Sequence, residues 1–166
     1  MYRMYKNKTI LLTVLLFSTI FAFLLTACET EAPEPSASIA DITLAITKSS
    51  EIMFPEMVEK KLSDAETYYH GMTMSIIDDT SYRINPAGAN PDEIAIFKTK
   101  STENTPELKR FLQTYASEKK KEWQDYQPGE VHKFDNVIIE SKGNYTVLFI
   151  CENPEKALEI FNGYFS

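Results

Sequence analysis

The spacing of apolar residues predicts helices from residue 39 onward. Ile39, Ile42 and Ile46 fall at positions i, i+3 and i+7, which places them on one face of a helix. Ser38 directly precedes this pattern and can cap the helix through its side chain. A second helix is expected to begin at Pro55, because proline suits the first helical turn.

The strongest helical pattern runs from Pro106 to Tyr126, with Thr105 as a potential cap and Pro128-Gly129 as its end. An inner stripe with helical spacing consists of Leu108, Phe111, Leu112, Tyr115, Lys119, Glu122, Trp123 and Tyr126. The lysine run at residues 119–121 interrupts this stripe and is expected to face solvent.

Strand patterns occur on both sides of the long helix. Residues 81–85 and 93–100 indicate strands, and the second is apolar on both faces at its centre, as an inner strand would be. Residues 135–151 predict a hairpin that turns at Gly143. Asn153 can cap a final helix. We therefore expect an α+β domain with a four-stranded, mostly antiparallel sheet, a ββαββα core preceded by N-terminal helices, and helices on one face of the sheet.

The first 27 residues have the pattern of a signal peptide: a basic start and then an apolar run. The last three residues of this segment and the next one, Leu25, Thr26, Ala27 and Cys28, resemble the lipobox of bacterial lipoproteins, which consists of leucine, two small residues and cysteine. The resemblance implies that lipid is attached to the Cys28 sulfur and that the chain is cleaved before it. A plain secretory signal and an uncleaved transmembrane anchor are the alternatives. Each would also place the domain outside the cytoplasmic membrane.

This reading divides the chain into three parts. Residues 1–27 are the signal peptide, residues 28–38 are the lipidated cysteine with a flexible acidic tether, and residues 39–166 are a single α+β domain. Three of the 17 Lys and Arg residues precede Cys28, so the mature part carries 14 of them against 24 Asp and Glu. Such an acidic surface argues against nucleic acid as a partner. The expected location is the outer face of the cytoplasmic membrane, through the lipid on Cys28.

Three motifs in the second part of the chain carry a family resemblance. They are DEIAIFK at residues 92–98, DYQPGEV at residues 125–131 and DNVIIESKGNYTVLFIC at residues 135–151. With the lipobox before them, the chain resembles the bacterial domain-of-unknown-function 4358 family, which is found mostly in Firmicutes and commonly as lipoproteins. The resemblance implies a fold and a location. It implies no activity, because none is established for the family.

Candidate chemistry is sparse in this sequence, and we expect no cofactor, no catalytic residues and no metal site. The two histidines, His70 and His132, lack the spacing of a zinc site. Cys151 lies in an apolar strand pattern and is expected to be a small buried residue without a disulfide partner. Residues Trp123, Tyr126 and Pro128 gather where the long helix ends and form a possible binding surface. The alternative is that both aromatic residues continue the core stripe while Pro128-Gly129 turns the chain.

Two functions remain open at this point. The first is a non-enzymatic lipoprotein module that binds an envelope protein or a small ligand. The second is a small envelope enzyme, or an enzyme accessory, that uses carboxylates with or without a divalent cation. The second function requires Asp78, Asp79, Asp92 or His132 to converge in a pocket.

Overall fold

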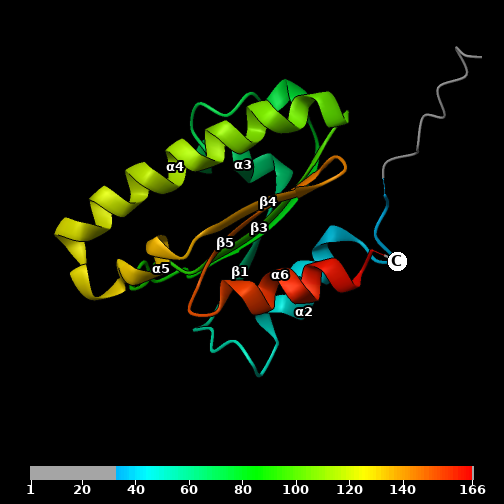
Figure 1. Ribbon diagram of the computed structural model, residues 1–166. Coiled ribbons are helices and arrows are strands. Elements are labelled where there is room, and N and C mark those ends of the chain that lie inside the picture. Colours follow the sequence, from blue (N-terminus) through cyan, green and yellow to red (C-terminus); the bar gives the residue numbers. More distant parts are fainter. Residues whose placement is uncertain (1–32, 166) are drawn as a thin grey trace, which may run out of the picture. The chain divides into compact units, whose positions relative to one another are not determined.

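A five-stranded antiparallel sheet forms the centre of the computed structural model, which describes residues 33–165 (Figure 1). The strands, in the order they have across the sheet, are β1 (Val58–Lys61), β2 (Ile77–Ile84), β3 (Glu93–Thr99), β5 (Tyr145–Ile150) and β4 (Ile138–Lys142). The helices are α2 (Ile39–Thr47), α3 (Leu62–Tyr68), α4 (Thr105–Tyr126), α5 (His132–Asp135) and α6 (Pro154–Gly163). Short 3-10 turns cover Met74–Ile76, Thr102–Asn104 and Pro128–Glu130. The α+β class is therefore confirmed.

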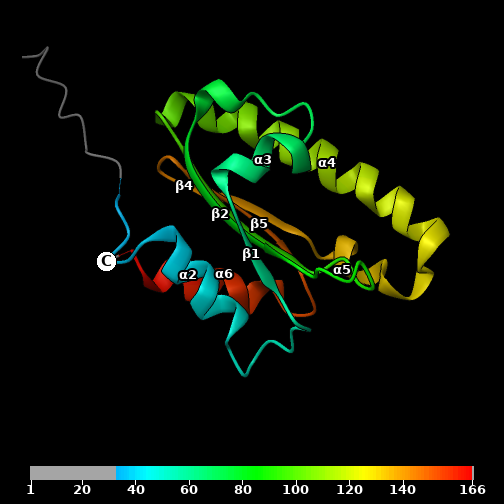
Figure 2. The same ribbon diagram turned by 180° about the vertical axis from the view of Figure 1, so that it is seen from behind.

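Helices cover both faces of the sheet, so the prediction of helices on one face only is wrong. Alternate residues of β3 point to opposite sides: Ile94 and Ile96 pack with α2 and α6, whereas Ala95 and Phe97 pack with α3 and α4. Figures 1 and 2 show these two helical layers on either side of the strands. A strand that is apolar on both faces needs a cover on each of them, because exposed apolar area is unfavourable.

The fifth strand, β1, is the element that the sequence pattern assigned to a helix. Val58 pairs with Ile84 and Lys61 pairs with Ser81, which makes β1 the edge strand beside β2. Pro55 lies in the preceding loop instead of opening a helix. Within such a short segment, apolar residues fit a helical and a strand spacing equally well, and long-range pairing with β2 decides the outcome.

The long helix, the last hairpin and the final helix lie where the sequence predicts them, whereas β2 begins four residues before the predicted strand and α5 was not predicted. The long helix α4 begins one residue early, at Thr105, with Asn104 in the cap position. The β4–β5 hairpin turns at Gly143, whose φ of 61° favours glycine. The side chain of Asn153 accepts a hydrogen bond from the Lys156 amide at the start of α6.

The described end of the predicted tether is bound to the domain. The Ser36 amide donates to the Tyr164 carbonyl at 2.7 Å. The Glu34 carboxylate accepts hydrogen bonds from the Tyr145 hydroxyl and from the Lys98 ammonium, the latter at 3.3 Å. These bonds, above all the one from Tyr145, hold the pKa of Glu34 below its usual value. Glu34 and Ser36, which belong to the predicted tether, are therefore in contact with the domain. The predicted signal peptide, the lipobox and Cys28 lie outside the described residues.

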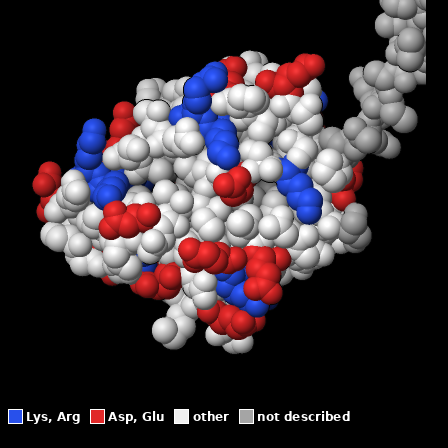
Figure 3. Space-filling view, viewed as in Figure 1, with Lys and Arg blue, Asp and Glu red and all other residues white. Residues whose placement is uncertain are grey.

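Within residues 33–165, no helix has the length and apolar character that crossing a bilayer requires. Figure 3 shows acidic and basic side chains interspersed on one face of this part, with acidic ones gathered along its lower edge.

Candidate functional site

A fully buried carboxylate stands at the start of β3. Glu93 is 0% exposed, and its side chain lies on the face of the sheet that α3 and α4 cover. It accepts hydrogen bonds from the hydroxyls of Tyr69 at 2.6 Å, Tyr115 at 2.8 Å and Tyr68 at 3.2 Å. The Lys119 ammonium lies 3.1 Å from the same carboxylate. We call these five residues the Glu93 cluster.

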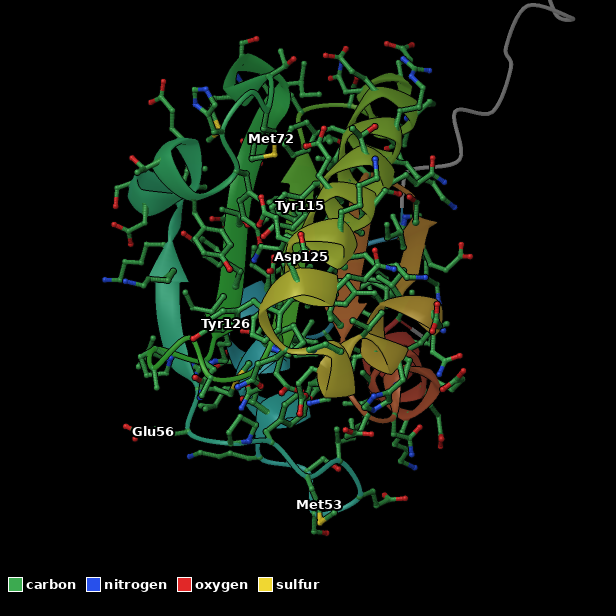
Figure 4. All side chains as sticks on the ribbon, turned by 90° about the vertical axis from the view of Figure 1, so that its left-hand side faces the viewer. Met53, Glu56, Met72, Tyr115, Asp125 and Tyr126 are labelled. Carbon is green, nitrogen blue, oxygen red and sulfur yellow. The ribbon has the colours of Figure 1, made fainter. Side chains whose placement is uncertain are left out.

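Three elements bring the Glu93 cluster together. Tyr68 and Tyr69 stand where α3 ends, and Tyr115 and Lys119 are four residues apart on α4, which places them on one helical face. Figure 4 shows Tyr115 between α4 and the sheet. The Lys119 nitrogen lies 4.7 Å and 5.0 Å from the ring centroids of Tyr68 and Tyr115, within the range of cation–π attraction.

The electrostatics of the Glu93 cluster favour protonated tyrosines and a charged lysine. Burial and the Glu93 charge raise the pKa of Tyr68 to about 12 and hold the pKa values of Tyr69 and Tyr115 well above the ordinary tyrosine value. Burial by itself would lower the pKa of Lys119, but the Glu93 carboxylate and the Tyr68 hydroxyl together raise it. At neutral pH the hydroxyls are therefore hydrogen-bond donors, and none of them is poised as a base or nucleophile.

A pocket of about 320 Å³ opens beside this cluster. Its walls come from β1, the end of α3, the β2–β3 loop and α4, and they comprise Val58, Lys60, Tyr68, Ile84, Asn85, Pro86, Gly88, Asn90, Pro91, Asp92, Lys119 and Trp123. Two prolines and Gly88, whose φ is +65°, fix the course of the loop wall. The volume lies in the range of small-ligand sites.

Two buried acceptors belong to residues of this wall. One carboxylate oxygen of Asp92 is bound by the Lys133 ammonium at 2.8 Å, and the other has no hydrogen-bond partner among the described residues. The amide oxygen of Asn90 likewise lacks a partner there. Both oxygens have almost no solvent-accessible surface, so they lie inside the wall and do not face the open pocket. A buried acceptor without a hydrogen bond costs free energy.

Behind the pocket, an ammonium is surrounded by carboxylates. Lys133 lies 2.8 Å from both Asp92 and Glu130 and 3.5 Å from Glu152. His132 in turn contacts Glu152 at 3.1 Å, and this hydrogen bond is the main cause that raises the pKa of His132 and lowers that of Glu152. Burial raises the pKa of Asp92 despite its bond to Lys133. The lysine thus fills the position in which a metal ion would have to sit among these acids.

Of the three predicted binding residues, Trp123 lines the pocket and Tyr126 and Pro128 do not. Trp123 lines the pocket, with its ring against Phe134 at 6.5 Å and Tyr126 at 5.6 Å between centroids. Tyr126 is 67% exposed at the end of α4, so it does not continue the core stripe (Figure 4). Pro128 opens the next turn, is exposed and does not line the pocket.

The carboxylates proposed for an enzyme do not converge. Asp78 and Asp79 are exposed at the beginning of β2, where Asp79 pairs with Lys98, whereas the end of β2 pairs with the beginning of β3, beside Asp92. His132 joins Asp92 only through the Lys133 network. Among residues 33–165, no group of three His, Cys, Asp or Glu side chains is arranged to hold a metal ion.

Sequence reasoning missed the Glu93 cluster, although two signals pointed to it. An acidic residue stands in a strand predicted to be an inner one, and a buried carboxylate needs a partner. Lys119 falls on the inner stripe of α4, so the prediction that the lysine run faces solvent is wrong for this residue. The prediction for Cys151 is confirmed: it is 1% exposed, and burial raises its pKa to about 12.

The comparisons with known proteins give one match. The family described as domain of unknown function DUF4358 matches residues 50–151, which is more than half of the chain and includes β1 to β5. No curated protein and no solved structure matches the chain. The matched segment contains every residue of the Glu93 cluster and every residue that lines the pocket. The chain therefore belongs to the DUF4358 family.

Proposed function

We propose that this protein is a lipid-anchored module on the outer face of the cytoplasmic membrane, and that it binds a small polar ligand in the pocket beside the Glu93 cluster. The observation that carries the proposal is the pocket itself. Tyr68 and Lys119 line one side, and both are held by the buried Glu93 carboxylate. Trp123 adds an aromatic side chain to the same pocket. Rigid walls with a few polar groups are what a binding site requires.

The anchoring part of the proposal rests on the Cys28 motif. Two acyl chains on this sulfur would hold the protein stably at the membrane, since each buried CH₂ contributes about 0.8 kcal/mol. The chain is bound to the domain from Glu34 onward. Because an extended residue spans at most about 3.6 Å, the segment between Cys28 and Glu34 reaches roughly 20 Å. The domain would therefore stay close to the bilayer.

A binding role is better supported than catalysis. The tyrosines of the Glu93 cluster keep their protons at neutral pH, and the ammonium of Lys119 is paired. Asp78 and Asp79 lie at the other end of β2 from Asp92, so a pair of acids across one cleft does not form from these residues.

Ligand binding can be tested by the melting temperature of the full chain in detergent, measured against a panel of envelope small molecules. A ligand present at about 100 times its Kd stabilises a protein by about 2.7 kcal/mol. We expect a rise with at least one compound, and we expect Trp123→Ala to abolish it while Asn136→Ala, outside the pocket, preserves it. A rise that survives in Trp123→Ala would contradict the pocket assignment, as would no rise with any compound.

Anchoring is tested separately by mass spectrometry of the N-terminus after expression in a bacterial host. The wild-type chain should begin at Cys28 and carry a diacylglycerol mass. The Cys28→Ala variant should keep its signal peptide and lack the lipid. Identical processing of both proteins would refute the lipobox assignment.

A further inference from the structure

We infer that the ligand of the pocket is a small organic carboxylate, with its charge at Lys60 and an apolar portion against Trp123. This inference rests on the proposed pocket function and adds the chemical class of the ligand. It draws on the unpaired ammonium of Lys60, the burial of the acids near the pocket and the apolar remainder of the lining.

Lys60 differs from the other lysines in the part of the chain that the structure describes. Six of them pair with carboxylates, and four more are exposed. Lys142 is half-buried, and its nitrogen lies 4.8 Å from the ring centroid of Phe165. Lys60 is also half-buried, but within residues 33–165 it has neither an ion pair nor a ring contact. A partly desolvated ammonium gains from an anionic partner, and a ligand can provide it.

The side chain of Lys60 lies on the same face of the sheet as the pocket. Lys60 is the partner of Tyr82 across β1 and β2, and side chains of such a pair point to the same side. Tyr82 belongs to the core that α3 and α4 cover, and so do Tyr68 and Trp123 of the pocket lining. Lys60 therefore brings its charge to the pocket from the edge strand.

The acids near the pocket are buried and paired. Asp92 is the acidic residue of the lining, and its side chain is 0% exposed and bound by Lys133. Glu93 is equally buried and is paired with Lys119. The accessible charge of the pocket is therefore positive, although the chain has 24 Asp and Glu against 17 Lys and Arg. A positive pocket in an acidic protein favours an anion as its ligand.

The hydrogen-bond donors of the pocket suit a carboxylate. Lys60 offers three N–H donors. Lys119 keeps one beside those engaged by Glu93 and by Tyr68 at 2.8 Å, and its side chain is 22% exposed. An ionised carboxylate only accepts hydrogen bonds, and its two oxygens can take donors from two sides. A phosphate carries more charge than this one unpaired lysine of the described lining can balance.

The rest of the lining gives an apolar portion of the ligand a place to pack. The apolar residues of the lining are Val58, Ile84, Pro86, Pro91 and Trp123. The ring of Trp123 is half-buried and lies against Tyr126 and Phe134. Apolar surface next to the carboxylate would be removed from water on these side chains.

Two matched pairs of compounds test the need for a charge. They are 4-methylpentanoate with 4-methylpentanamide, and phenylacetate with phenylacetamide. Each amide has nearly the shape of its acid but no charge. The full chain in a neutral detergent is titrated by calorimetry, and the emission of Trp123, the single tryptophan, is followed on the same samples. We expect saturable binding of at least one carboxylate and at least tenfold weaker binding of its amide.

Variants of the edge strand show where the carboxylate binds. Lys60→Met removes the ammonium and should weaken binding at least tenfold, whereas Lys60→Arg keeps a charge and should still bind. Lys61→Met is the matched control, because Lys61 is exposed and pairs with Ser81, whose hydroxyl bonds to Thr43 on the other face of the sheet. This control should bind like the wild type. Equal affinity of Lys60→Met and the wild type would overturn the inference.

Failure of the ligand class and failure of the pocket function give different results. The inference is overturned if neither carboxylate gives a saturable signal up to about 10 mM, or if an amide binds as tightly as its acid. If uncharged compounds then raise the melting temperature in a Trp123-dependent way, the pocket function stands and only the ligand class is wrong. If no compound does so, the proposed function fails as well.

Discussion

Replacing Lys119 with methionine removes the one cation that pairs with the buried Glu93 within residues 33–165. The lysine nitrogen lies 3.1 Å from the carboxylate, and the Glu93 side chain is 0% exposed. Methionine has a similar length and preserves the packing of the stem on α4, but it leaves the carboxylate without a counter-charge. The variant should therefore fold less stably than the wild type.

The size of the loss follows from the burial and from the remaining contacts. Breaking a buried ion pair by removing one partner costs about 3–5 kcal/mol. Three tyrosine hydroxyls still donate to Glu93 in the variant, which places the expected loss near the lower limit, about 3 kcal/mol. For a domain of this size, such a loss lowers the melting temperature by roughly 10 °C.

Urea unfolding of Lys119→Met and of Lys121→Met measures the difference. Lys121 is exposed two residues further along the same helix, so its replacement should change the free energy of unfolding by about 0.5 kcal/mol or less. The double variant Glu93→Gln with Lys119→Met removes both charges and should recover a large part of the loss. If Lys119→Met is as stable as Lys121→Met, the Glu93 cluster does not have the energetic role argued here.

Three further outcomes are expected. Tyr82→Phe removes a buried hydroxyl that has no partner among the described residues, so the free energy of unfolding should stay unchanged or rise by about 1 kcal/mol. Tyr69→Phe removes the hydrogen bond to Glu93 and should lower the free energy of unfolding by about 2 kcal/mol. Urea titrations measure both. Cys151 should stay unmodified by N-ethylmaleimide at neutral pH in the native protein and react in urea, as peptide mass spectrometry can show; reaction in the native state contradicts its burial. His132, whose pKa is raised mainly by Glu152, stabilises the fold in its charged form, so its contribution is present below about pH 6.5 and is lost as the pH rises through the raised pKa. NMR titration should show that pKa fall in Glu152→Gln, and an unchanged value would contradict the contact.

The sequence predicts the elements whose signals are local and strong. The stripe and prolines of α4, the Gly143 turn of the last hairpin and the Asn153 cap of α6 lie where their residue types require them. The short edge strand β1 could not be predicted in this way. Its four residues gain their conformation from pairing with residues of β2 that lie between 20 positions away, for Lys61 and Ser81, and 26 positions away, for Val58 and Ile84.

The site was less predictable than the fold, for a related reason. Trp123 was singled out and does line the pocket, because an aromatic residue at a helix end is visible locally. The bonds of Glu93 to Tyr69 and Tyr115 span 24 and 22 positions, and no spacing rule connects them. A charge within an inner strand indicates that a partner exists, but only the packing of α3 and α4 on the sheet shows which residues provide it.

The most direct test of the pocket as the binding site is an NMR titration of the isotope-labelled protein with a compound that raises its melting temperature. The single tryptophan gives one indole N–H signal, which reports on the pocket without further assignment. The account predicts a saturable shift of this signal together with amide shifts confined to the segments that line the pocket: residues 58–60, Tyr68, residues 84–92 and the part of α4 from Lys119 to Trp123. An unmoved indole signal, or shifts gathered on another face of the domain, would contradict it.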